Sequence, residues 1–298
     1  MTLFSDKLKD VDIVYDNLRK QKSKTLKSIH NDLEQMWSSY EPYADEHFRS
    51  DFAYDPKSRF WEMYLTLILL KEGKNVLPRN ELPKLNRDRR PDICIQENGT
   101  TIWIEATAPE PGDASNPDRV PEVIPINEGG GVQDVPRRQV ELRITGALLE
   151  KKNAFQSYLE SEIVSESDFR IIEISGAKFS IQALPSQFPR AVTAVYPIGD
   201  QYVTFDRENL EVTETGFHPS FTISRTNSSD IPRHSFLSPE FSQISGLIWS
   251  RISIGNGTSE TPTDLTMIHN HAAEIKFPIN WASWANEYDT REKGEDIT

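Results

Sequence analysis

The first quarter of the chain carries apolar residues at the three- and four-residue spacing of an α-helix. The spacing holds from about residue 5 to 47, and its apolar positions are Leu8, Val11, Val14, Leu18, Leu26, Ile29, Leu33 and Met36. A second helix is predicted after Asp55-Pro56 and stops at Gly73, and a third spans about residues 137 to 162. Long helices are therefore expected mainly in the N-terminal half of the chain.

Between the second and third helices, two runs of alternating apolar residues flank Asn98-Gly99. Asn-Gly in this setting is the strongest short-range signal for a β-hairpin with a two-residue turn. If Glu97 pairs with Thr100, the side chains of the hairpin divide between two faces. The apolar face, which should be core, carries Ile93, Ile95, Ile102 and Ile104. The other face, which is typical of the floor of a site, carries Asp92, Cys94, Gln96, Thr101, Trp103, Glu105 and Thr107.

Beyond the third helix the pattern is mainly that of β-strands. Residues 169–175 are predicted to form a buried strand, and further candidate strands are 202–205, 221–224, 245–253 and 265–269. The expected fold class is α/β, with a mixed sheet flanked by helices. Its expected parts are an N-terminal helical segment (1–50), an α/β core (51–180), a β-rich part that completes or decorates the core (181–285) and a polar, frayed tail (286–298).

Composition and charge narrow the class of protein. A chain of 298 residues with 37% hydrophobic residues can bury a full globular core. Its formal net charge of −13 argues against indiscriminate coating of nucleic acid or membrane, but is compatible with a local basic groove. The only cysteine, Cys94, excludes intrachain disulfides and cysteine-rich zinc sites. Because we find no secretory signal pattern and no apolar run that could span a membrane, we expect a cytoplasmic protein.

Asp92 and Glu105 fall directly opposite each other in the predicted hairpin register. Opposed side chains have Cβ atoms about 4.5–5.5 Å apart, where like charges repel. A cation between the two carboxylates would remove this repulsion, and Mg²⁺ prefers carboxylate and water oxygens while leaving positions free for a phosphate. The alternative is an exposed hairpin face on which both acids are solvated. The proline before Asp92 and the apolar residues around Glu105 favour the metal site.

These acids belong to a longer ordered set, which comprises Glu62 on the second helix, Arg90-Pro91-Asp92 on one strand and Ile104-Glu105-Ala106-Thr107 on its partner. In order and spacing the set resembles the PD-(D/E)XK nuclease superfamily, the fold of many restriction endonucleases. The resemblance covers about residues 55 to 175 and implies a restriction-endonuclease-like core. It also implies that Asp92 and Glu105 bind Mg²⁺ or Mn²⁺ directly. Glu62 would then orient a metal-bound water or support a second cation.

The chain departs from the family at Thr107, where the family places a lysine two residues after the second acid. That lysine positions or activates the attacking water, and in some members it comes from the following helix instead. Lys151 is the best substitute here, because it shares a face of the third helix with the apolar residues Ile144, Leu148, Phe155 and Leu159. The alternative for Lys151 is an ammonium that extends along the apolar surface to solvent.

The function implied by the resemblance is metal-dependent hydrolysis of nucleic-acid phosphodiester bonds. DNA is the favoured substrate, and a homodimer is common in the superfamily for double-strand cleavage. The residues that would grip the nucleic-acid backbone are Arg87, Arg89, Arg90, Arg137, Arg138 and Arg143. Each of these also has the alternative of being an ordinary surface arginine. The acidic loop from Glu110 to Asp134 would cover the groove.

Two rival interpretations remain open at the level of the sequence. The first is a non-catalytic relative that keeps the fold and binds nucleic acid or a partner protein, and Thr107 is the observation that favours it. The second places a zinc or iron site at His269 and His271, because alternation on a strand would put both imidazoles on one face. No cysteine or acidic cluster lies nearby in the sequence to complete such a site.

Overall fold

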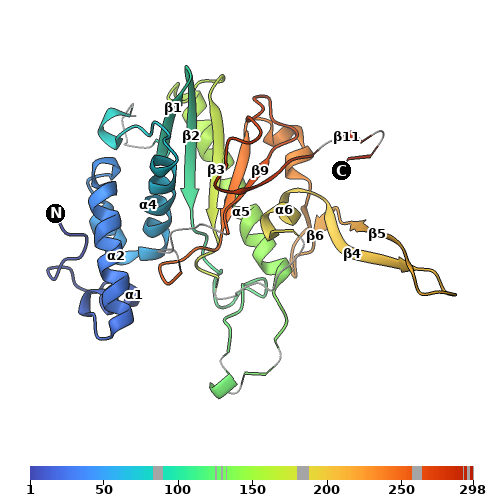
Figure 1. The fold of residues 1–298 in the computed structure, drawn as a ribbon, viewed down its shortest axis with the longest axis horizontal. Coiled ribbons are helices and arrows are strands. Elements are labelled where there is room, and N and C mark those ends of the chain that lie inside the picture. Colours follow the sequence, from blue (N-terminus) through green and yellow to red (C-terminus); the bar gives the residue numbers. More distant parts are fainter. Residues whose placement is uncertain are drawn as a thin grey trace.

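The computed structural model describes residues 1–82, 90–124, 126–128, 130–131, 133–179, 188–256, 264–290, 292–293 and 296–297. A mixed six-stranded sheet in the order β1-β2-β3-β8-β9-β10 forms its centre (Figure 1). The strands of this sheet are β1 (Ile93–Glu97), β2 (Thr100–Thr107), β3 (Phe169–Ser175), β8 (Gly246–Ser250), β9 (Thr266–His269) and β10 (Asn286–Tyr288). The mixed α/β class with helices around one sheet is therefore confirmed.

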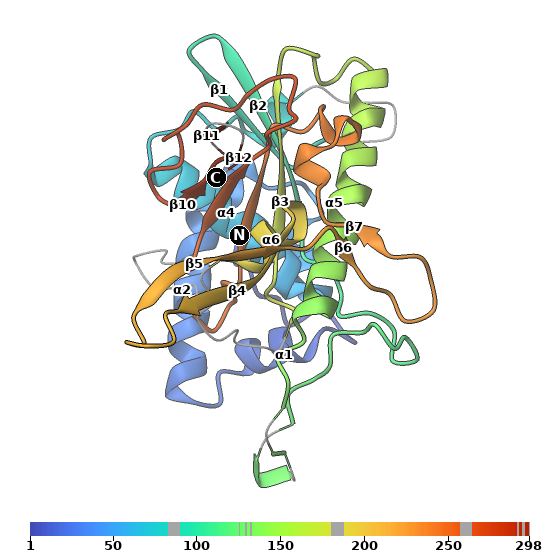
Figure 2. The same ribbon diagram turned by 90° about the vertical axis from the view of Figure 1, so that its right-hand side faces the viewer.

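Helices cover both faces of the sheet and create two apolar cores (Figures 1 and 2). The helices are α1 (Ile13–Lys20), α2 (Lys24–Tyr40), α3 (Phe48–Tyr54), α4 (Pro56–Lys71), α5 (Arg137–Glu160) and α6 (Arg190–Val195). Apolar residues of α1 to α4 pack with Ile102 and Ile104 of β2 in one core. Those of α5 and α6 pack with Trp103 of the same strand in the other core. Alternate residues of β2 therefore face different helices, as the two-residue period requires.

The hairpin has the register that the sequence predicts. Ile93 pairs with Ile104, Ile95 with Ile102, and Glu97 with Thr100. Asn98 and Gly99 both have positive φ angles, of 51° and 80°, which two-residue turns of the primed type require. Val76, in the segment between α4 and the hairpin, forms an isolated antiparallel bridge to Ile95 of β1.

The crossover through α5 places β3 parallel to β2, with Ala106 beside Glu173. Strand β8 continues parallel to β3, and β9 then pairs antiparallel to β8. Strand β10 pairs parallel to β9, so the expectation of a frayed tail is wrong for Asn286–Tyr288. These three residues are held by backbone pairing to a buried strand, which their polar composition does not reveal.

The continuous helix expected over residues 5 to 47 is also wrong, because the segment divides into shorter pieces. Helix α1 starts after Asp12, whose carboxylate accepts a hydrogen bond from the backbone amide of Val14. The helix ends at Gln21, which has a left-handed backbone conformation with φ of 48°. Ser23 then caps α2 by accepting the amide of Leu26. Both turns use local capping groups that a search for apolar spacing alone does not detect.

The remaining elements are short or lie at the periphery. A hairpin of β4 (Ile198–Phe205) and β5 (Val212–Pro219) projects from the body, and β6 (Thr222–Ile223) pairs with β7 (Ile231–Pro232) (Figure 1). Strands β11 (Glu292–Lys293) and β12 (Asp296–Ile297) pair with each other. The 3₁₀ turns are η1 (Glu41–Tyr43), η2 (Arg79–Glu81), η3 (Ile126–Glu128), η4 (Ser235–Leu237) and η5 (Pro239–Phe241). Among the described helices, none has the length and apolarity needed to cross a membrane.

The turn of the hairpin gives a stability test. Replacing Gly99 with alanine would force a Cβ into a conformation with φ of 80°, so we expect a loss of about 1 kcal/mol in the free energy of unfolding. Gly146 provides the matched control, because it lies exposed inside α5 with no atom within 4 Å of its missing Cβ. Gly146→Ala should stabilise the protein by roughly 0.5–1 kcal/mol in the same denaturant titration. Equal effects of the two substitutions would contradict the turn geometry.

Candidate active site

A cleft of about 380 Å³ opens at the C-terminal end of β2, the arrowhead of that strand in Figure 1. Its walls come from α3 and α4, from the β1–β2 hairpin and from α5. The lining residues are Asp51, Tyr54, Asp55, Ser58, Arg59, Glu62, Asp92, Glu105, Ala106, Thr107, Ala108 and Lys151. The four residues expected to carry chemistry from the sequence therefore lie in one cleft, although they come from three separate segments.

Asp92 is held at the start of β1 by backbone contacts. Its Oδ2 atom accepts the amide of Ala106 at 2.8 Å, which ties it to the neighbouring strand. Arg79 donates to the carbonyls of Pro91 and Asp92 at 2.9 and 2.7 Å, and its Nη1 lies 4.0 Å from Oδ1 of Asp92. The aspartate is thus positioned at the cleft while one carboxylate oxygen makes only a long ion pair.

Glu105 is a nearly buried acid that is paired with the lysine of α5. Lys151 donates from Nζ to Oε1 of Glu105 at 3.0 Å, and the hydroxyl of Tyr158 lies 3.4 Å from Oε2. The expected inward orientation of Lys151 is confirmed by this ion pair. Burial and then the charge of Asp92 raise the pKa of Glu105 to about 8, although Lys151 opposes the shift. Burial opposes the charge on Lys151, but Glu105 and Asp92 outweigh it and raise the pKa of the ammonium.

Glu62 approaches the same cleft from α4. The hydroxyl of Tyr40 donates to one of its oxygens at 2.8 Å, and Arg59 donates to the other at 2.8 Å. Only 4% of Glu62 is exposed, so this helix acid is buried and does not lie at the protein surface. Burial and then the charge of Asp92, which lines the same cleft, raise the pKa of Glu62.

Glu173 is a buried acid that the sequence analysis missed. It lies on β3 beside Ala106, is 0% exposed, and neither carboxylate oxygen has a hydrogen-bond partner among the described residues. Burial, followed by Asp92 and Glu62, raises its pKa well above the usual range. The signal was present, because a glutamate inside the strand sequence Ile-Ile-Glu-Ile leaves an acid in a buried strand.

A second cation at the cleft was also missed. Lys178 follows β3 and pairs with Asp55, a cleft residue, at 2.7 Å, and also with Glu110. The acidic loop therefore contacts the edge of the cleft at Glu110, whereas the part of it that carries η3 extends away from the body (Figure 1). Coverage of the cleft by the whole loop, as the sequence suggested, is not what the structure shows.

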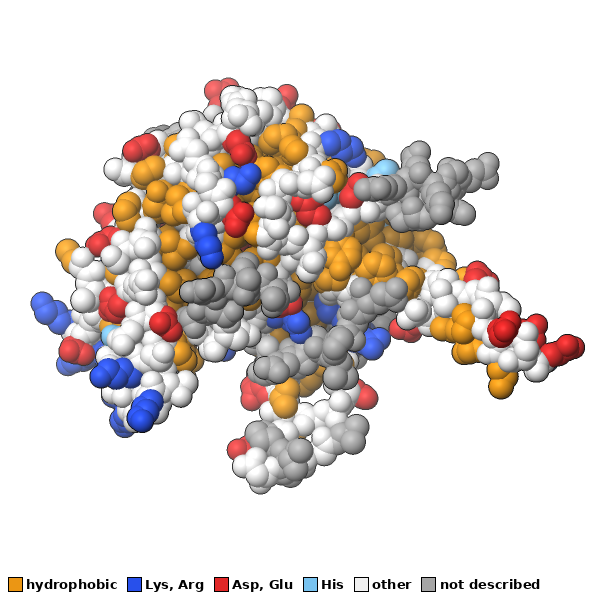
Figure 3. All heavy atoms as spheres, in the orientation of Figure 1, with side chains coloured by type: hydrophobic (Ala, Val, Ile, Leu, Met, Phe, Trp, Pro, Cys, Tyr) orange, Lys and Arg blue, Asp and Glu red, His pale blue; other side chains and the backbone are white. Residues whose placement is uncertain are grey.

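The arginines expected to grip nucleic acid do not gather around the cleft. Arg138 pairs with Asp118 at 2.6 Å, and Arg143 packs beside Gly112 at the base of the loop. Arg90 donates to the carbonyl of Leu82 at 3.3 Å. Arg87 and Arg89 lie outside the described residues. In the view of Figure 3, basic side chains gather instead near the turn between α1 and α2, where the sequence has Lys20, Lys22 and Lys24.

The possible metal ligands differ in how closely they approach one another. In the described part of the chain, no three carboxylate, imidazole or thiolate groups converge closely enough to hold one ion. At the second proposed site, His269 lies 3.2 Å from Glu287, and His271 lies 2.9 Å from the hydroxyl of Thr290. The two histidines thus have different partners, because β9 ends at His269 and the strand alternation stops there.

The raised pKa of Glu105 makes stability depend on pH. The ordinary pKa of a glutamate is 4.5, and that of Glu105 in the folded protein is about 8. Between these two pH values the Glu105 carboxyl holds a proton in the folded protein and releases it in the unfolded chain. Stability should therefore fall as pH rises through this window. Glu105→Gln lacks this contribution, so its stability relative to the wild type should rise by an amount on the order of a few kcal/mol from pH 5 to pH 8.

Denaturant titrations at several pH values measure this difference. Glu208→Gln, at an exposed position, serves as the control and should show no such pH-dependent change relative to the wild type. A difference between Glu105→Gln and the wild type that stays constant with pH would contradict the raised pKa.

Comparisons with known proteins identify no relative of this chain. No protein-family model, no curated protein and no solved structure matches the chain. The assignment of chemistry therefore depends on the residues of the cleft themselves.

Proposed function

We propose that the chain is a metal-dependent phosphodiesterase that hydrolyses nucleic acid, with DNA as the first substrate to test. The observation that carries the proposal is the Glu105–Lys151 pair, which lies with Asp92 and Glu62 in one cleft. Perturbed acids that face a cleft beside a lysine are a common feature of catalytic centres. The arrangement also supplies, from α5, the cation that Thr107 cannot provide.

The donor set suits a hard divalent cation. Asp92 and Glu105 offer carboxylate oxygens, which Mg²⁺ and Mn²⁺ prefer. Asp92 is held by a single strong hydrogen bond, and the charge of Glu105 is balanced by an ammonium that can move on its flexible stem. When bound, such a cation would lower the pKa of a water molecule and neutralise charge on the phosphate. Burial and the charge of Asp92 raise the pKa of Glu105, and a bound cation would oppose both effects.

The acids and the lysine of the cleft would then have distinct roles. Asp92 and Glu105 would hold the cation, and Glu62, fixed by Tyr40 and Arg59, would accept a hydrogen bond from a water on the helix side. Lys151, released from Glu105, orients the attacking water or balances charge on the phosphate. Tyr158 limits how far the Glu105 carboxylate can rotate.

The second candidate function is a non-catalytic module of the same fold that binds nucleic acid or a protein. Thr107 and the close Glu105–Lys151 pair favour it, because an acid already neutralised by a lysine has no need of a metal ion. In this case the pair would act only as a structural contact between α5 and the sheet. Metal dependence separates the two functions.

The first experiment incubates the purified protein with supercoiled plasmid, single-stranded DNA and RNA in the presence of Mg²⁺ or Mn²⁺. We expect cleavage that Asp92→Asn or Glu105→Gln reduces at least about 100-fold, because each substitution removes charge directed at the reacting group. Glu208→Gln should cleave at the wild-type rate. If no substrate is cleaved and calorimetry shows no binding of either metal, the non-catalytic module becomes the better conclusion.

Lys151 and Lys152 form a matched pair for the second test. Lys151 reaches Glu105, whereas the ammonium of Lys152 lies 5.7 Å from the centre of the Phe241 ring. Lys151→Met should reduce cleavage about 100-fold or more and yet tighten Mn²⁺ binding, since the ammonium no longer competes for the carboxylate. Lys152→Met should change neither quantity. Unchanged cleavage in the Lys151 variant would remove this lysine from the proposed chemistry.

A further inference from the structure

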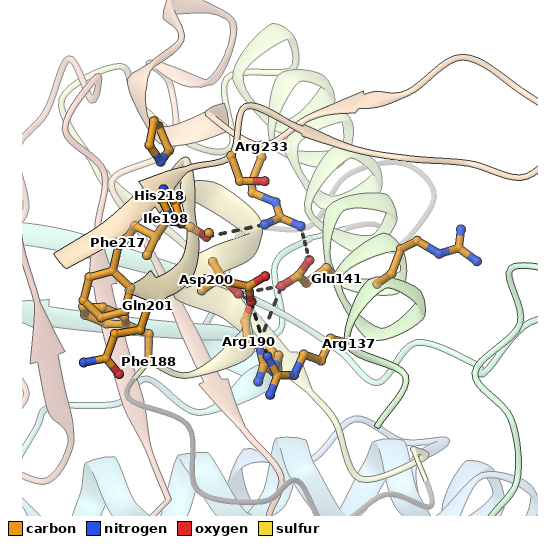
Figure 4. A pocket seen from close by; sticks show the side chains of 15 residues that line it. Arg137, Glu141, Phe188, Arg190, Ile198, Asp200, Gln201, Phe217, His218 and Arg233 are labelled. Atoms are coloured by element: carbon orange, nitrogen blue, oxygen red, sulfur yellow. Dashed lines mark hydrogen bonds and ion pairs between the residues drawn. The ribbon is translucent and has the colours of Figure 1, made fainter. Parts of the chain in front are cut away.

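A second pocket, separate from the cleft, lies where the N-terminal end of α5 meets α6 and the β4–β5 hairpin (Figure 4). Its volume is about 650 Å³, within the range of small-molecule sites. Four arginines line it, Arg137, Arg138, Arg190 and Arg233, and none of its residues lines the cleft. Arg138 is already paired at 2.6 Å with Asp118, which lies outside the pocket lining. Glu141 and Lys151, which mark the two sites on α5, are ten residues apart, or roughly 15 Å along the helix axis.

The buried part of the pocket contains more positive than negative charge. Glu141 is 3% exposed, and Arg233 reaches it at 2.5 Å and Arg190 at 3.9 Å. One carboxylate thus faces two largely buried guanidinium groups. Arg137 adds a third, and its own partner Asp200 is 3.6 Å away and highly exposed, so this ion pair is weak. The excess is local, because the chain as a whole has a net charge of −13.

The guanidinium groups also have unused hydrogen-bonding capacity. The Nε atoms of Arg190 and Arg233 are buried without a partner among the described residues. Burial and then the charge of Arg137 lower the pKa of Arg190, which records the repulsion between these cations. Arginine does not lose its proton in proteins, so a bound anion is the available way to relieve that repulsion.

An aromatic wall stands beside the arginines. The rings of Phe188 and Phe217 lie 5.0 Å apart between centroids (Figure 4). Guanidinium groups match the oxygens of a phosphate, and phenylalanine rings provide a surface on which a nucleobase can stack. A carboxylate or sulfate would use the arginines alone and leave this wall without a role.

We infer that the arginine pocket binds a nucleoside 5′-phosphate, with the phosphate on Arg137, Arg190 and Arg233 and the base against Phe188 and Phe217. The phosphate would take over from Glu141 as a partner of the guanidinium groups. The ligand is either a free nucleotide or the phosphorylated end of a strand, which share this chemistry. Binding needs no metal ion and does not depend on the proposed function of the cleft.

Calorimetry in EDTA tests the inference with the full chain. The probes are inorganic phosphate, adenosine 5′-monophosphate and adenosine, followed by one oligonucleotide with a 5′-phosphate or a 5′-hydroxyl end. We expect the monophosphate to bind more tightly than phosphate, and adenosine not to bind measurably. Tighter binding of the 5′-phosphorylated strand than of the monophosphate would assign the pocket to strand ends, and the reverse order to free nucleotides. Equal binding of adenosine and its monophosphate, or no binding of any phosphate probe, would overturn the inference.

Three variants distinguish a binding pocket from a purely structural network. Arg137→Gln, at a half-exposed position, should weaken monophosphate binding about tenfold. Glu141→Gln removes the competing carboxylate and should tighten binding, the opposite of what loss of structure would produce. Arg207→Gln makes the same charge change at an exposed position beyond β4 and should have no effect. If Arg137→Gln and Glu141→Gln bind as the wild type does, the pocket is not the phosphate site.

Discussion

The register of the β1–β2 hairpin is the constraint on which the candidate active site depends. Pairing of Ile93 with Ile104 places the apolar side chains toward α4 and sends the Glu105 side chain toward α5. A slip of one residue would exchange the two faces and bury the acid among the isoleucines. The Asn98-Gly99 turn and the two apolar cores therefore stabilise the same register. The contact between Glu105 and Lys151 follows from this agreement.

The cleft and the neighbouring strand β3 contain acids whose burial costs stability. Glu62, Glu105 and Glu173 are each at most 6% exposed, and burial is the largest cause of the raised pKa of every one. Burying a carboxylate without full pairing costs stability, and a fold under no other demand would replace it with an apolar residue. Glu173, with no partner among the described residues, is the clearest case. Departures of this kind from the local rules of stability are expected mainly at functional or strained sites.

Helix α5 connects the two sites of the molecule. Its N-terminal part presents Arg137 and Glu141 to the arginine pocket, and its middle presents Lys151 to the cleft. The helix also forms the crossover between β2 and β3, so its position is set by the sheet that it covers. A ligand that alters the contacts of Glu141 in one pocket thus acts on the element that carries the lysine of the other. A continuous helix between the two pockets is a physical route by which binding in one could affect the other.

The sequence by itself determined the elements whose signals are local. The hairpin register, the limits of α4 near Asp55 and Gly73, and strand β3 follow from turn chemistry, capping and alternation over a few residues. Strand and helix periods also singled out the Asp92–Glu105 pair and the apolar face that carries Lys151, whereas Glu62 came from the family resemblance; the structure places all four residues in one cleft. The tertiary structure alone decided that Lys151 reaches Glu105 and that Glu173 has no hydrogen-bond partner in the described part of the chain. It also decided that Arg137, Arg190 and Arg233 line one pocket. Those contacts join segments far apart in the chain, and burial and ion pairing arise only when the crossover and the outer elements pack together.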